Sequence, residues 1–527
     1  MSGRSQQYGV VIVLLCLLQV AAVAQITRPK RISIEFGGSE SRLYQIPAGI
    51  MGAQLGWIPN GFYKNRAALH LLKQAGLSSI RVDALLHKIY GTPTPDWSQI
   101  DPVIESLHAA ELQPLIVMGY TPSWLQPSPN PCPATGAVAY HALPNNIDRW
   151  AQLAGEFVAH MNRLFPDFIH DYEIWNEPDT PAGLCVAPNT DDKRRGVYRE
   201  MYAAASRAMR AQALDARVQI RIGGPALEKF QSAGVWIPAL LTNSTTAANV
   251  DFVSYHQYFG TASDLAAGFP WDAHGPQSLL SRTRNPKIGA AVALGKVFAS
   301  AKHSAHGARL PVFLDEYNTT DSFQADCCRN SPVYAPVWNA LFVQQILNSV
   351  YRYNNRLPRR LMYFAAQDWF ATDNPNTAWY CLVGTLNAAM DCAYDEASAR
   401  PYPQYYALAL LAGARYLNLA SGGILATKLL TSKPLEVSGW RTAKQYSVVI
   451  TNPTSILSKT QIKFKRIGSG TRRAKLFLLN GQNPEILEKE MTIRNGTFEV
   501  AVPGYSVVGI AISYEAASEF SKHPISR

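Results

Sequence analysis

The sequence predicts an α/β fold in which a (β/α)8 TIM barrel is followed by a C-terminal β-sandwich. Between residues 46 and 412, short apolar strand candidates alternate with helical stretches, which is typical of parallel βα units. After Tyr416 the sequence changes to β-rich stretches separated by Gly, Asn and Pro. The 527 residues are 47% apolar and only 17% charged, so they can build a large core and a second, smaller domain.

Eight barrel strands are expected, because a closed barrel of this type repeats the βα unit eight times. Helical patterns lie between the strand candidates, at Asn65–Ala75, Trp150–Leu164 and Tyr198–Leu214. The carboxyl ends of the parallel strands meet at one mouth, so we expect the functional residues there. The strand candidates are Ala48–Gln54, Ser79–Asp83, Gln113–Gly119, Asp171–Trp175, Gln219–Gly223, Phe252–Tyr258, Pro311–Tyr317 and Leu361–Trp369.

The sandwich is expected from β-rich stretches at Gln445–Thr451, Arg473–Leu479, Thr492–Val502 and Tyr505–Ser513. An early stretch, Arg31–Glu35, also alternates apolar and polar residues and is expected to pair with the sandwich. The expected division is a signal peptide at 1–24, the N-terminal segment that pairs with the sandwich at 25–45, the barrel at 46–415, the sandwich at 416–515 and a loose tail at 516–527.

The first residues predict export. Arg4 precedes an apolar run, Gly9–Leu18, and Ala22-Val23-Ala24 fits a small-residue cleavage site. The run is much shorter than the roughly 20 residues that a membrane span needs. We therefore expect cleavage near Ala24 and a secreted or periplasmic protein without a membrane anchor.

Cleavage would leave six of the seven cysteines, and an even number in an exported chain permits disulfides. Cys381 and Cys392 are the preferred local pair, although other pairings stay open. The cysteine spacings do not match a zinc site. The formal net charge of +11 is spread along the chain, without a basic tract interleaved with aromatic residues, so nucleic-acid binding is not expected.

Glu177 lies in Trp175-Asn176-Glu177-Pro178, directly after a predicted strand. Pro178 cannot continue the hydrogen-bond ladder and is expected to bias Glu177 toward an extended backbone. A carboxyl group beside an aromatic ring in a cleft can have a raised pKa, as a general acid requires. The alternative is a solvated loop acid without a function.

Glu316 ends another apolar run, three strand candidates later. Glycoside hydrolysis through a covalent intermediate needs a nucleophilic carboxylate and a separate acid/base, and a closed barrel brings distant strand ends together. Side chains would act as the acid, the base and the nucleophile, so no cofactor or metal is expected. Glu316 could instead be the structural partner of a buried Arg. Glu173 and Asp315 are expected to be structural, with side chains on the other face of each strand.

Several stretches are shared with one known group of enzymes. They are Trp175-Asn176-Glu177-Pro178, Glu316 three strands later, and the segments 80–83, 97–101, 115–122 and 252–256. Through them, residues 46–415 resemble clan A of the glycoside hydrolases and are most similar to family 39, the β-xylosidase and α-L-iduronidase family. The resemblance implies a barrel with a sandwich behind it and a retaining glycosidase.

The resemblance also implies roles for individual residues. Glu177 would be the acid/base, Glu316 the nucleophile, and Asn176 a partner of the sugar hydroxyl next to the reacting carbon. In addition, His256 and Tyr258 would orient Glu316 or the sugar, Arg81 would keep Glu316 ionised, and Trp369 would form an aromatic wall under the sugar. Apart from the resemblance, Tyr120 is expected to line the pocket because it lies near the end of the third strand.

Three of these residues have structural alternatives, which are a packing salt bridge for Arg81 and core positions for His256 and Trp369. Asp83 departs from the histidine that the xylosidase pattern has after Arg81, which puts the identity of the sugar in doubt.

The expected activity is cleavage of terminal glycosidic bonds in an oligosaccharide or polysaccharide-derived substrate, with β-xyloside as the first choice. The alternatives are an endo-acting clan A glycanase and a carbohydrate-binding homologue that has lost catalysis. Intact carboxylates at both motif positions argue against a pure binder, which has no need of both.

Overall fold

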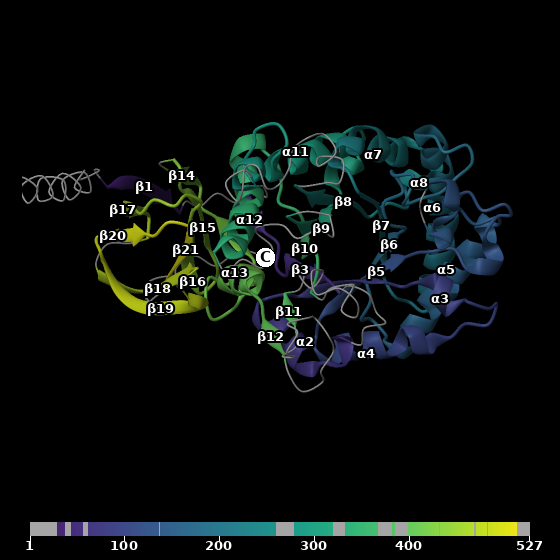
Figure 1. Ribbon diagram of the computed structural model, residues 1–527, viewed down its shortest axis with the longest axis horizontal. Coiled ribbons are helices and arrows are strands. Elements are labelled where there is room, and N and C mark those ends of the chain that lie inside the picture. The colour runs from purple at the N-terminus through teal and green to yellow at the C-terminus, as the bar shows by residue number, and fades with distance from the viewer. Residues whose placement is uncertain are drawn as a thin grey trace, which may run out of the picture.

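The computed structural model shows a closed parallel barrel beside a large, mostly antiparallel sheet (Figure 1). It describes residues 29–36, 44–55, 62–135, 138–259, 279–319, 333–366, 382–384, 399–431, 433–467, 471–481 and 483–513. Trp369, the preferred cysteine pair 381/392, the predicted signal peptide and the predicted loose tail lie outside the described residues.

The barrel confirms the predicted fold class, because eight parallel strands pair in chain order and β10 closes the ring against β3. Two strands have the predicted bounds, and the other six differ at one end or both. The strands are β3 (Met51–Gln54), β4 (Ser79–Asp83), β5 (Gln113–Met118), β6 (Asp171–Ile174), β7 (Arg221–Leu227), β8 (Phe252–Tyr258), β9 (Val312–Asn318) and β10 (Arg360–Tyr363).

Helices surround the barrel (Figure 1). Two of them begin earlier than the apolar pattern predicts, because polar side chains cap them one turn or more ahead of it. Asn146 accepts a hydrogen bond from the Arg149 N–H before α5, and Thr190 accepts one from the Lys193 N–H before α6. The longer helices are α2 (Arg66–Gln74), α4 (Asp101–Ala109), α5 (Ile147–Leu164), α6 (Asp191–Asp215), α7 (Ala233–Thr242), α11 (Ala290–Ala301), α12 (Tyr334–Tyr353) and α13 (Pro403–Ala412).

The barrel interior changes from apolar to polar along the strands. Leu115, Phe252, Phe313 and Met362 form an apolar cluster in which the two Phe rings stack at 4.1 Å. Gly223 makes room for this cluster, because a Cβ there would lie 2.3 Å from the Phe252 ring. Further along β8 and β9, the buried side chains are polar and charged. The strands therefore place an apolar floor under a polar layer near the mouth.

The second domain is an 11-stranded sheet in the order β14-β1-β17-β20-β19-β18-β21-β16-β15-β13-β2. The early stretch forms β1, which pairs with β17 in parallel and with β14 antiparallel. The bounds are β1 (Lys30–Glu35), β2 (Gln45–Ile46), β13 (Gly423–Leu425), β14 (Lys428–Leu430), β15 (Glu436–Arg441), β16 (Gln445–Asn452), β17 (Ser458–Lys465), β18 (Thr471–Asn480), β19 (Asn483–Arg494), β20 (Thr497–Val502) and β21 (Ser506–Ser513).

The expected β-rich stretch Thr492–Val502 contains a chain reversal and forms the end of β19 and all of β20. Asn495 and Gly496 lie between them with φ angles of 49° and 65°. An Asn-Gly pair with positive φ at both residues is typical of a tight β-hairpin turn. The reversal therefore lies at this pair, between two stretches of alternating apolar residues.

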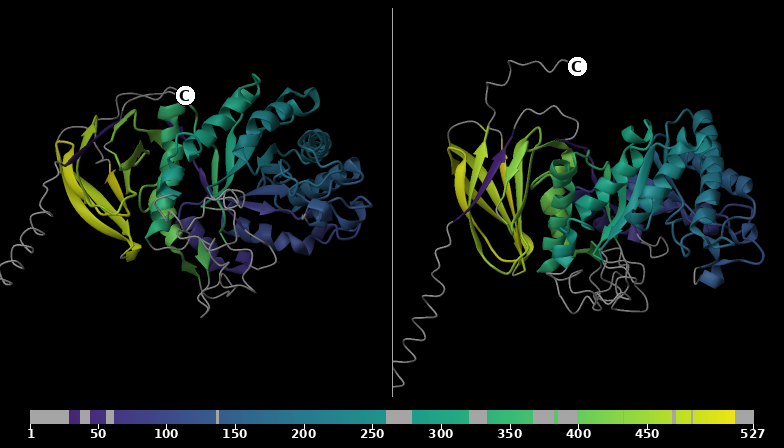
Figure 2. Two further views of the ribbon diagram at one scale, coloured as in Figure 1. Left: turned by 45° about the horizontal axis from the view of Figure 1, so that its top comes forward. Right: turned by 90° about the horizontal axis from the view of Figure 1, so that it is seen from above.

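The sheet has two apolar faces. Val448 and Ile450 of β16 point into a cluster with residues of β1 and β17, whereas Val449 belongs to the core shared with the barrel. On the latter face, Gly509 of β21 allows close contact, because a Cβ there would lie 3.0 Å from a methyl carbon of Leu410. Figure 2 shows the sheet against α12 and α13 on this side. The sandwich therefore supports the barrel through a continuous core.

Within the described part of the chain, we find no helix that combines the length and the apolarity needed to cross a bilayer.

Candidate active site

The two predicted carboxylates lie together at the carboxyl ends of their strands, Glu177 after β6 and Glu316 within β9. A carboxylate oxygen of each and a ring nitrogen of His256 lie within 4.8 Å of one another. Glu316 is only 7% exposed, whereas the side chain of Glu177 is 26% exposed. The barrel thus brings a buried carboxylate and a more accessible one to one site.

The prediction of an extended backbone at Glu177 is wrong. Its φ is 50°, in the left-handed region, and Trp175 has a φ of 69°. The reason is a tight turn after β6, in which the Glu177 N–H donates to the Ala226 carbonyl at 3.0 Å and its own carbonyl accepts from the Thr180 N–H. Gly183 is required against this turn, because a Cβ there would lie 1.9 Å from the Glu177 carbonyl oxygen.

Glu316 accepts a hydrogen bond on each oxygen. Arg81 Nη1 donates to Oε1 at 2.5 Å, and the Tyr258 hydroxyl donates to Oε2 at 2.6 Å. Burial raises the pKa of the Glu316 carboxyl, and Glu177 acts in the same direction, whereas His256, Arg81 and Tyr258 oppose the rise. The two donors fix the orientation of the carboxylate and favour its ionised form.

Arg81 lies fully buried at the centre of the polar layer. Its guanidinium donates to Glu173 at 2.9 Å, to the Asn176 side-chain oxygen at 2.7 Å and to Gln54 at 3.1 Å, besides Glu316. Burial acts to lower the pKa of Arg81, but the surrounding carboxylates raise it well above its ordinary value. Arg81 therefore contacts Glu316 and also forms the packing salt bridge with Glu173.

Glu173 and Asp315 both point into the barrel, so the prediction that they occupy the other face is wrong. Glu173 contacts Arg81, and Asp315 Oδ2 lies 3.7 Å from Arg81 Nε. The register between β8 and β9 shifts, so that Tyr255 faces Leu314 but His256 faces Glu316. Asp315 is thus an extra residue in a bulge, which lets two successive side chains face inward.

His256 of β8 is fully buried, with Nδ1 2.7 Å from Glu177 Oε1 and 3.5 Å from Glu316 Oε2. Burial lowers the pKa of His256 to about 4, although the charge of Glu316 opposes the shift. The imidazole is therefore neutral at neutral pH and contacts both carboxylates, which a core histidine does not require.

Tyr120, which follows β5, also lies close enough to both carboxylates to be affected by their charges. Burial raises the pKa of Tyr120, and the nearby charges of Asp83, Glu177 and Glu316 act in the same direction. Its ring lies 5.3 Å from Trp175 and 4.4 Å from His141. Asp83, which stands where the family pattern has histidine, accepts a 3.5 Å hydrogen bond from Gln54.

Sequence reasoning missed several residues near the mouth. Tyr140 stacks on His87 with ring centroids 4.0 Å apart, and His141 contacts Tyr120. The available signal was their position, because Tyr140 and His141 follow β5 in a loop at the mouth, where this fold carries its functional residues.

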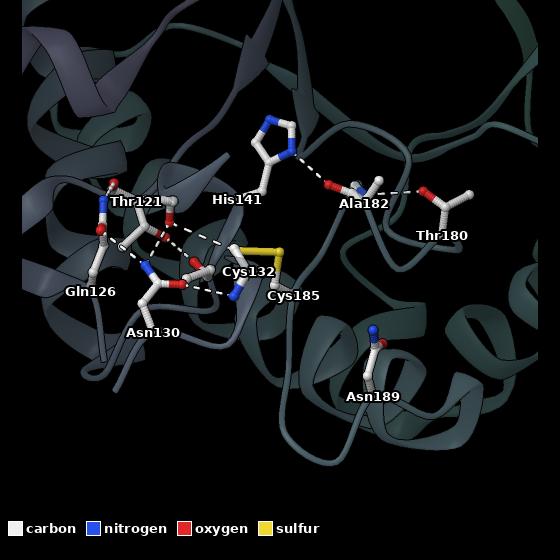
Figure 3. The surroundings of a disulfide bond; sticks show 12 residues. Thr121, Gln126, Asn130, Cys132, His141, Thr180, Ala182, Cys185 and Asn189 are labelled. Atoms are coloured by element: carbon white, nitrogen blue, oxygen red, sulfur yellow. Dashed lines mark hydrogen bonds between the residues drawn. A yellow bond between two sulfur atoms is a disulfide. The ribbon is translucent and has the colours of Figure 1, made fainter. Parts of the chain in front are cut away.

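A disulfide between Cys132 and Cys185 joins the loop after β5 to the loop after β6 (Figure 3). Hydrogen bonds reinforce the link, since the Cys185 N–H donates to the His141 carbonyl at 3.0 Å and His141 Nδ1 lies 2.6 Å from the Ala182 carbonyl. The loop that follows Glu177 is therefore anchored on the neighbouring loop.

Among the described residues, Glu177, His256 and Glu316 are close enough to one another to hold a metal ion. Their ligand atoms are, however, already engaged, since both oxygens of Glu316 accept hydrogen bonds and His256 Nδ1 faces Glu177. This pattern fits a pair of reacting carboxyl groups better than a common coordination centre.

Comparison with known proteins agrees with this architecture. Residues 69–413 match the model of glycosyl hydrolases family 39. No curated protein sequence matches the chain significantly.

Among solved structures, the chain is similar to a monomeric β-xylosidase from Caulobacter crescentus CB15, with 17% identity, a TM-score of 0.64 and coverage of 92% of this chain and 100% of that one. A family 39 enzyme from Xanthomonas axonopodis pv. citri gives 16% identity, a TM-score of 0.61 and coverages of 93% and 98%. A family 30 subfamily 8 xylanase from Clostridium acetobutylicum gives 14% identity, a TM-score of 0.60 and coverage of 92% of this chain and 100% of that one. These likenesses show the fold.

Proposed function

Because the chain belongs to glycosyl hydrolase family 39 and is therefore a glycosidase that acts on carbohydrate, we propose that it cleaves terminal glycosidic bonds with net retention of configuration. The observation that carries the proposal is the approach of carboxylate oxygens of Glu177 and Glu316 to within 4.8 Å. Retaining enzymes hold these groups about 5–5.5 Å apart, whereas inverting enzymes leave about 6.5–9.5 Å for a water molecule.

In the first step, the carboxylate of Glu316 attacks the anomeric carbon of the terminal sugar. The bond between that carbon and the glycosidic oxygen breaks, and the leaving oxygen takes the proton of Glu177. A glycosyl ester on Glu316 and an ionised Glu177 result. The partial exposure of the Glu177 side chain suits a group that must reach the leaving oxygen.

In the second step, a water molecule attacks the anomeric carbon and gives a proton to Glu177. The ester bond to Glu316 breaks, so both carboxyl groups return to their starting state. Two inversions at one carbon give net retention. Every proton moves between the substrate, water and Glu177, so the cycle is complete with side chains alone.

The neighbouring residues act on this pair. Arg81 and Tyr258 orient Glu316 and keep it ionised, and His256 holds Glu177. Asn176 uses its side-chain oxygen for Arg81, so its amide hydrogens can bind the sugar hydroxyl next to the reacting carbon. Tyr120 lines the pocket. The role of Trp369 as an aromatic wall remains part of the proposal from the resemblance.

The first choice of substrate is a β-xyloside, as the resemblance implies and as the name of the Caulobacter enzyme indicates for that protein. We expect hydrolysis of an aryl β-xyloside to exceed that of aryl α-L-arabinoside, β-glucoside and uronide substrates. Release of single terminal sugars from a linear oligosaccharide would support exo action. Release of internal fragments would instead support an endo-acting glycanase.

The decisive experiment follows the stereochemistry and the nucleophile separately. Proton NMR of the first turnovers should show the sugar released with the anomeric configuration of the substrate. Glu316→Ala should abolish hydrolysis and, with azide, yield a glycosyl azide of inverted configuration, because azide replaces the missing nucleophile. Wild-type activity in Glu316→Ala would overturn the assignment of the nucleophile.

Export of the protein is also proposed, from the predicted signal peptide. The Cys132–Cys185 disulfide supports it, since disulfides persist in oxidising compartments outside the cytosol. Mass spectrometry of the protein from the culture medium or the periplasm should give a mature N-terminus at Gln25. An intact Met1 there would contradict the proposal.

A further inference from the structure

Three carboxyl groups share one guanidinium inside the barrel. Glu173, Asp315 and Glu316 surround Arg81, and the side chains of Arg81, Glu173 and Asp315 are fully buried. One positive charge cannot balance three buried negative charges, and an unpaired buried charge is costly. The charge balance around Arg81 therefore depends on which of these three carboxyl groups is protonated.

The hydrogen bonds indicate which group is neutral. Glu173 Oε2 accepts from Arg81, but Glu173 Oε1 and both oxygens of Asp315 have no donor among the described residues if both groups are ionised. The two carboxyl groups nevertheless lie within hydrogen-bonding reach of each other. A single proton between them converts two repelling acceptors into a donor and an acceptor.

His256 points to the same conclusion. Its Nδ1 contacts Glu177, and its Nε2 lies 3.8 Å from Asp315 Oδ1 without a hydrogen-bond partner in the described part of the chain. When Glu177 is ionised, Nδ1 carries the hydrogen, so Nε2 presents a lone pair that an ionised Asp315 would repel. When Glu177 is protonated, as the first step of the proposed cycle requires, Nδ1 accepts that proton's hydrogen bond and Nε2 carries the hydrogen, which the carbonyl oxygen of a neutral Asp315 can accept. A neutral Asp315 therefore suits both states of Glu177, whereas an ionised Asp315 suits only one.

We propose that Asp315 holds a proton at neutral pH and donates it, from its carboxyl O–H, to Glu173 Oε1. The titratable groups that interact electrostatically with Asp315 come from several elements. They are Arg81 from β4, Glu173 from β6, Tyr255 and His256 from β8, Glu316 beside it on β9, and Tyr198 from α6.

The electrostatics of the pair agree with this geometry. Burial, the charge of Glu173 and the hydrogen bond with it raise the pKa of Asp315 well above its ordinary value, and Arg81 opposes the rise. Burial also acts to raise the pKa of Glu173, but Arg81 and the hydrogen bond with Asp315 hold it below its ordinary value. Because Arg81 Nε donates to Glu173 at 2.9 Å but lies 3.7 Å from Asp315, the negative charge is stabilised on Glu173 and the proton belongs to Asp315.

The consequence for catalysis rests on the proposed function. With Asp315 neutral, Arg81 balances Glu173 and remains bonded to Glu316, the proposed nucleophile. An ionised Asp315 would compete for Arg81 and would add a negative charge beside Glu316, which would raise the pKa of Glu316. Asp315 is thus a positioning residue that keeps the nucleophile ionised without touching the substrate.

Infrared spectroscopy tests the proton directly, with the full chain and without substrate. At pH 7 we expect a C=O stretch of a protonated carboxyl group that shifts on 13C labelling of aspartate. Asp315→Asn should remove this band, whereas Asp83→Asn, in a half-buried aspartate of the same barrel, should leave it. Absence of an Asp315-dependent band at pH 7 would overturn the proposal, whether or not the protein hydrolyses glycosides.

The pH profile of kcat/KM tests the positioning role. Asp315→Asn keeps a neutral donor, so the acidic limb should stay at the wild-type pH and kcat/KM should fall by no more than about tenfold. Glu173→Gln would allow Asp315 to ionise, so the limb should move to higher pH and kcat/KM should fall about 100-fold or more. An equal shift of the limb in Asp315→Asn, or failure of that variant to fold, would contradict a neutral Asp315.

Discussion

His256 Nδ1 lies 2.7 Å from Glu177 Oε1, and the imidazole that makes this contact is fully buried. Because burial lowers its pKa to about 4, the ring stays neutral at the pH at which Glu177 would exchange protons with the substrate. Each protonation state of Glu177 then finds a partner on Nδ1, as acceptor or as donor. The histidine that holds the proposed acid/base therefore also makes the stability of the fold depend on pH.

The first prediction concerns stability in acid. The pKa of His256 in the folded protein, about 4, is below the unfolded value of about 6.5. The contribution of His256 to the unfolding free energy is therefore complete above pH 6.5 and is lost as pH falls toward 4. The difference corresponds to about 3 kcal/mol of unfolding free energy. Urea unfolding of His256→Asn should therefore depend less on pH between 7 and 4 than that of the wild type.

A matched control is His170→Asn, which replaces a partly exposed histidine just before β6, at the opposite end of the barrel. Its unfolding free energy should vary with pH as in the wild type. An unchanged pH dependence in His256→Asn would contradict the neutral, buried histidine.

Arg81→Lys should damage both activity and folding. A lysine presents a compact point charge and cannot reproduce the planar contacts with Glu173, Asn176 and Glu316. We expect kcat/KM to fall at least about 100-fold and the unfolding free energy to fall by about 3 kcal/mol, because partly unpaired carboxylates stay buried. Steady-state kinetics and urea unfolding measure the two effects.

Arg221→Lys is the control for this change, because Arg221 pairs with Asp171 through two hydrogen bonds of 2.6 and 2.8 Å at the amino end of β6. It should lower stability modestly, and kcat/KM should stay near the wild-type value. Equal kinetic losses in both variants would show that Arg81 acts only through packing.

Tyr258→Phe should weaken the proposed nucleophile. Its hydroxyl donates to Glu316 Oε2 at 2.6 Å and lowers the pKa of that carboxyl, so its removal should raise the pKa further. The acidic limb of kcat/KM should move to higher pH, and kcat should fall about 10- to 100-fold, as for the loss of a hydrogen bond to a charged group.

Tyr255→Phe on the same strand is the control, since its buried hydroxyl has no hydrogen-bond partner among the described residues. The pH profile of this variant should match that of the wild type. A wild-type profile in Tyr258→Phe as well would contradict a role for its hydroxyl.

The fold was predictable from the sequence where a segment lies within one regular strand. Ser79–Asp83 and Phe252–Tyr258 have the predicted bounds, because each is a short segment with β-branched or aromatic residues that forms one uninterrupted strand. The hairpin at Asn495 and Gly496 was also encoded locally, since the Asn-Gly pair has positive φ at both residues and the apolar alternation changes from odd to even positions there.

The details of the site depend on contacts between strands and were not predictable in this way. That Asp315 and Glu316 both point inward follows from the register shift between β8 and β9, and the φ of Glu177 follows from its bond to Ala226. The partner of Cys132 depends on the approach of two loops that are 53 residues apart. Local patterns thus predicted the catalytic candidates, while the closure of the barrel determines their surroundings.

The disulfide carries the last prediction. Its loop of 53 residues restricts the unfolded chain, so replacing both Cys132 and Cys185 by Ala should lower the unfolding free energy by about 2–4 kcal/mol. The loop after Glu177 should also loosen, because the bond anchors the segment that contacts His141 and the Glu177 carbonyl. We therefore expect a lower kcat with nearly unchanged KM. A thiol reductant should produce the same loss in the wild type and no further loss in the double variant; a wild-type kcat in the double variant would show that hydrogen bonds alone hold the loop.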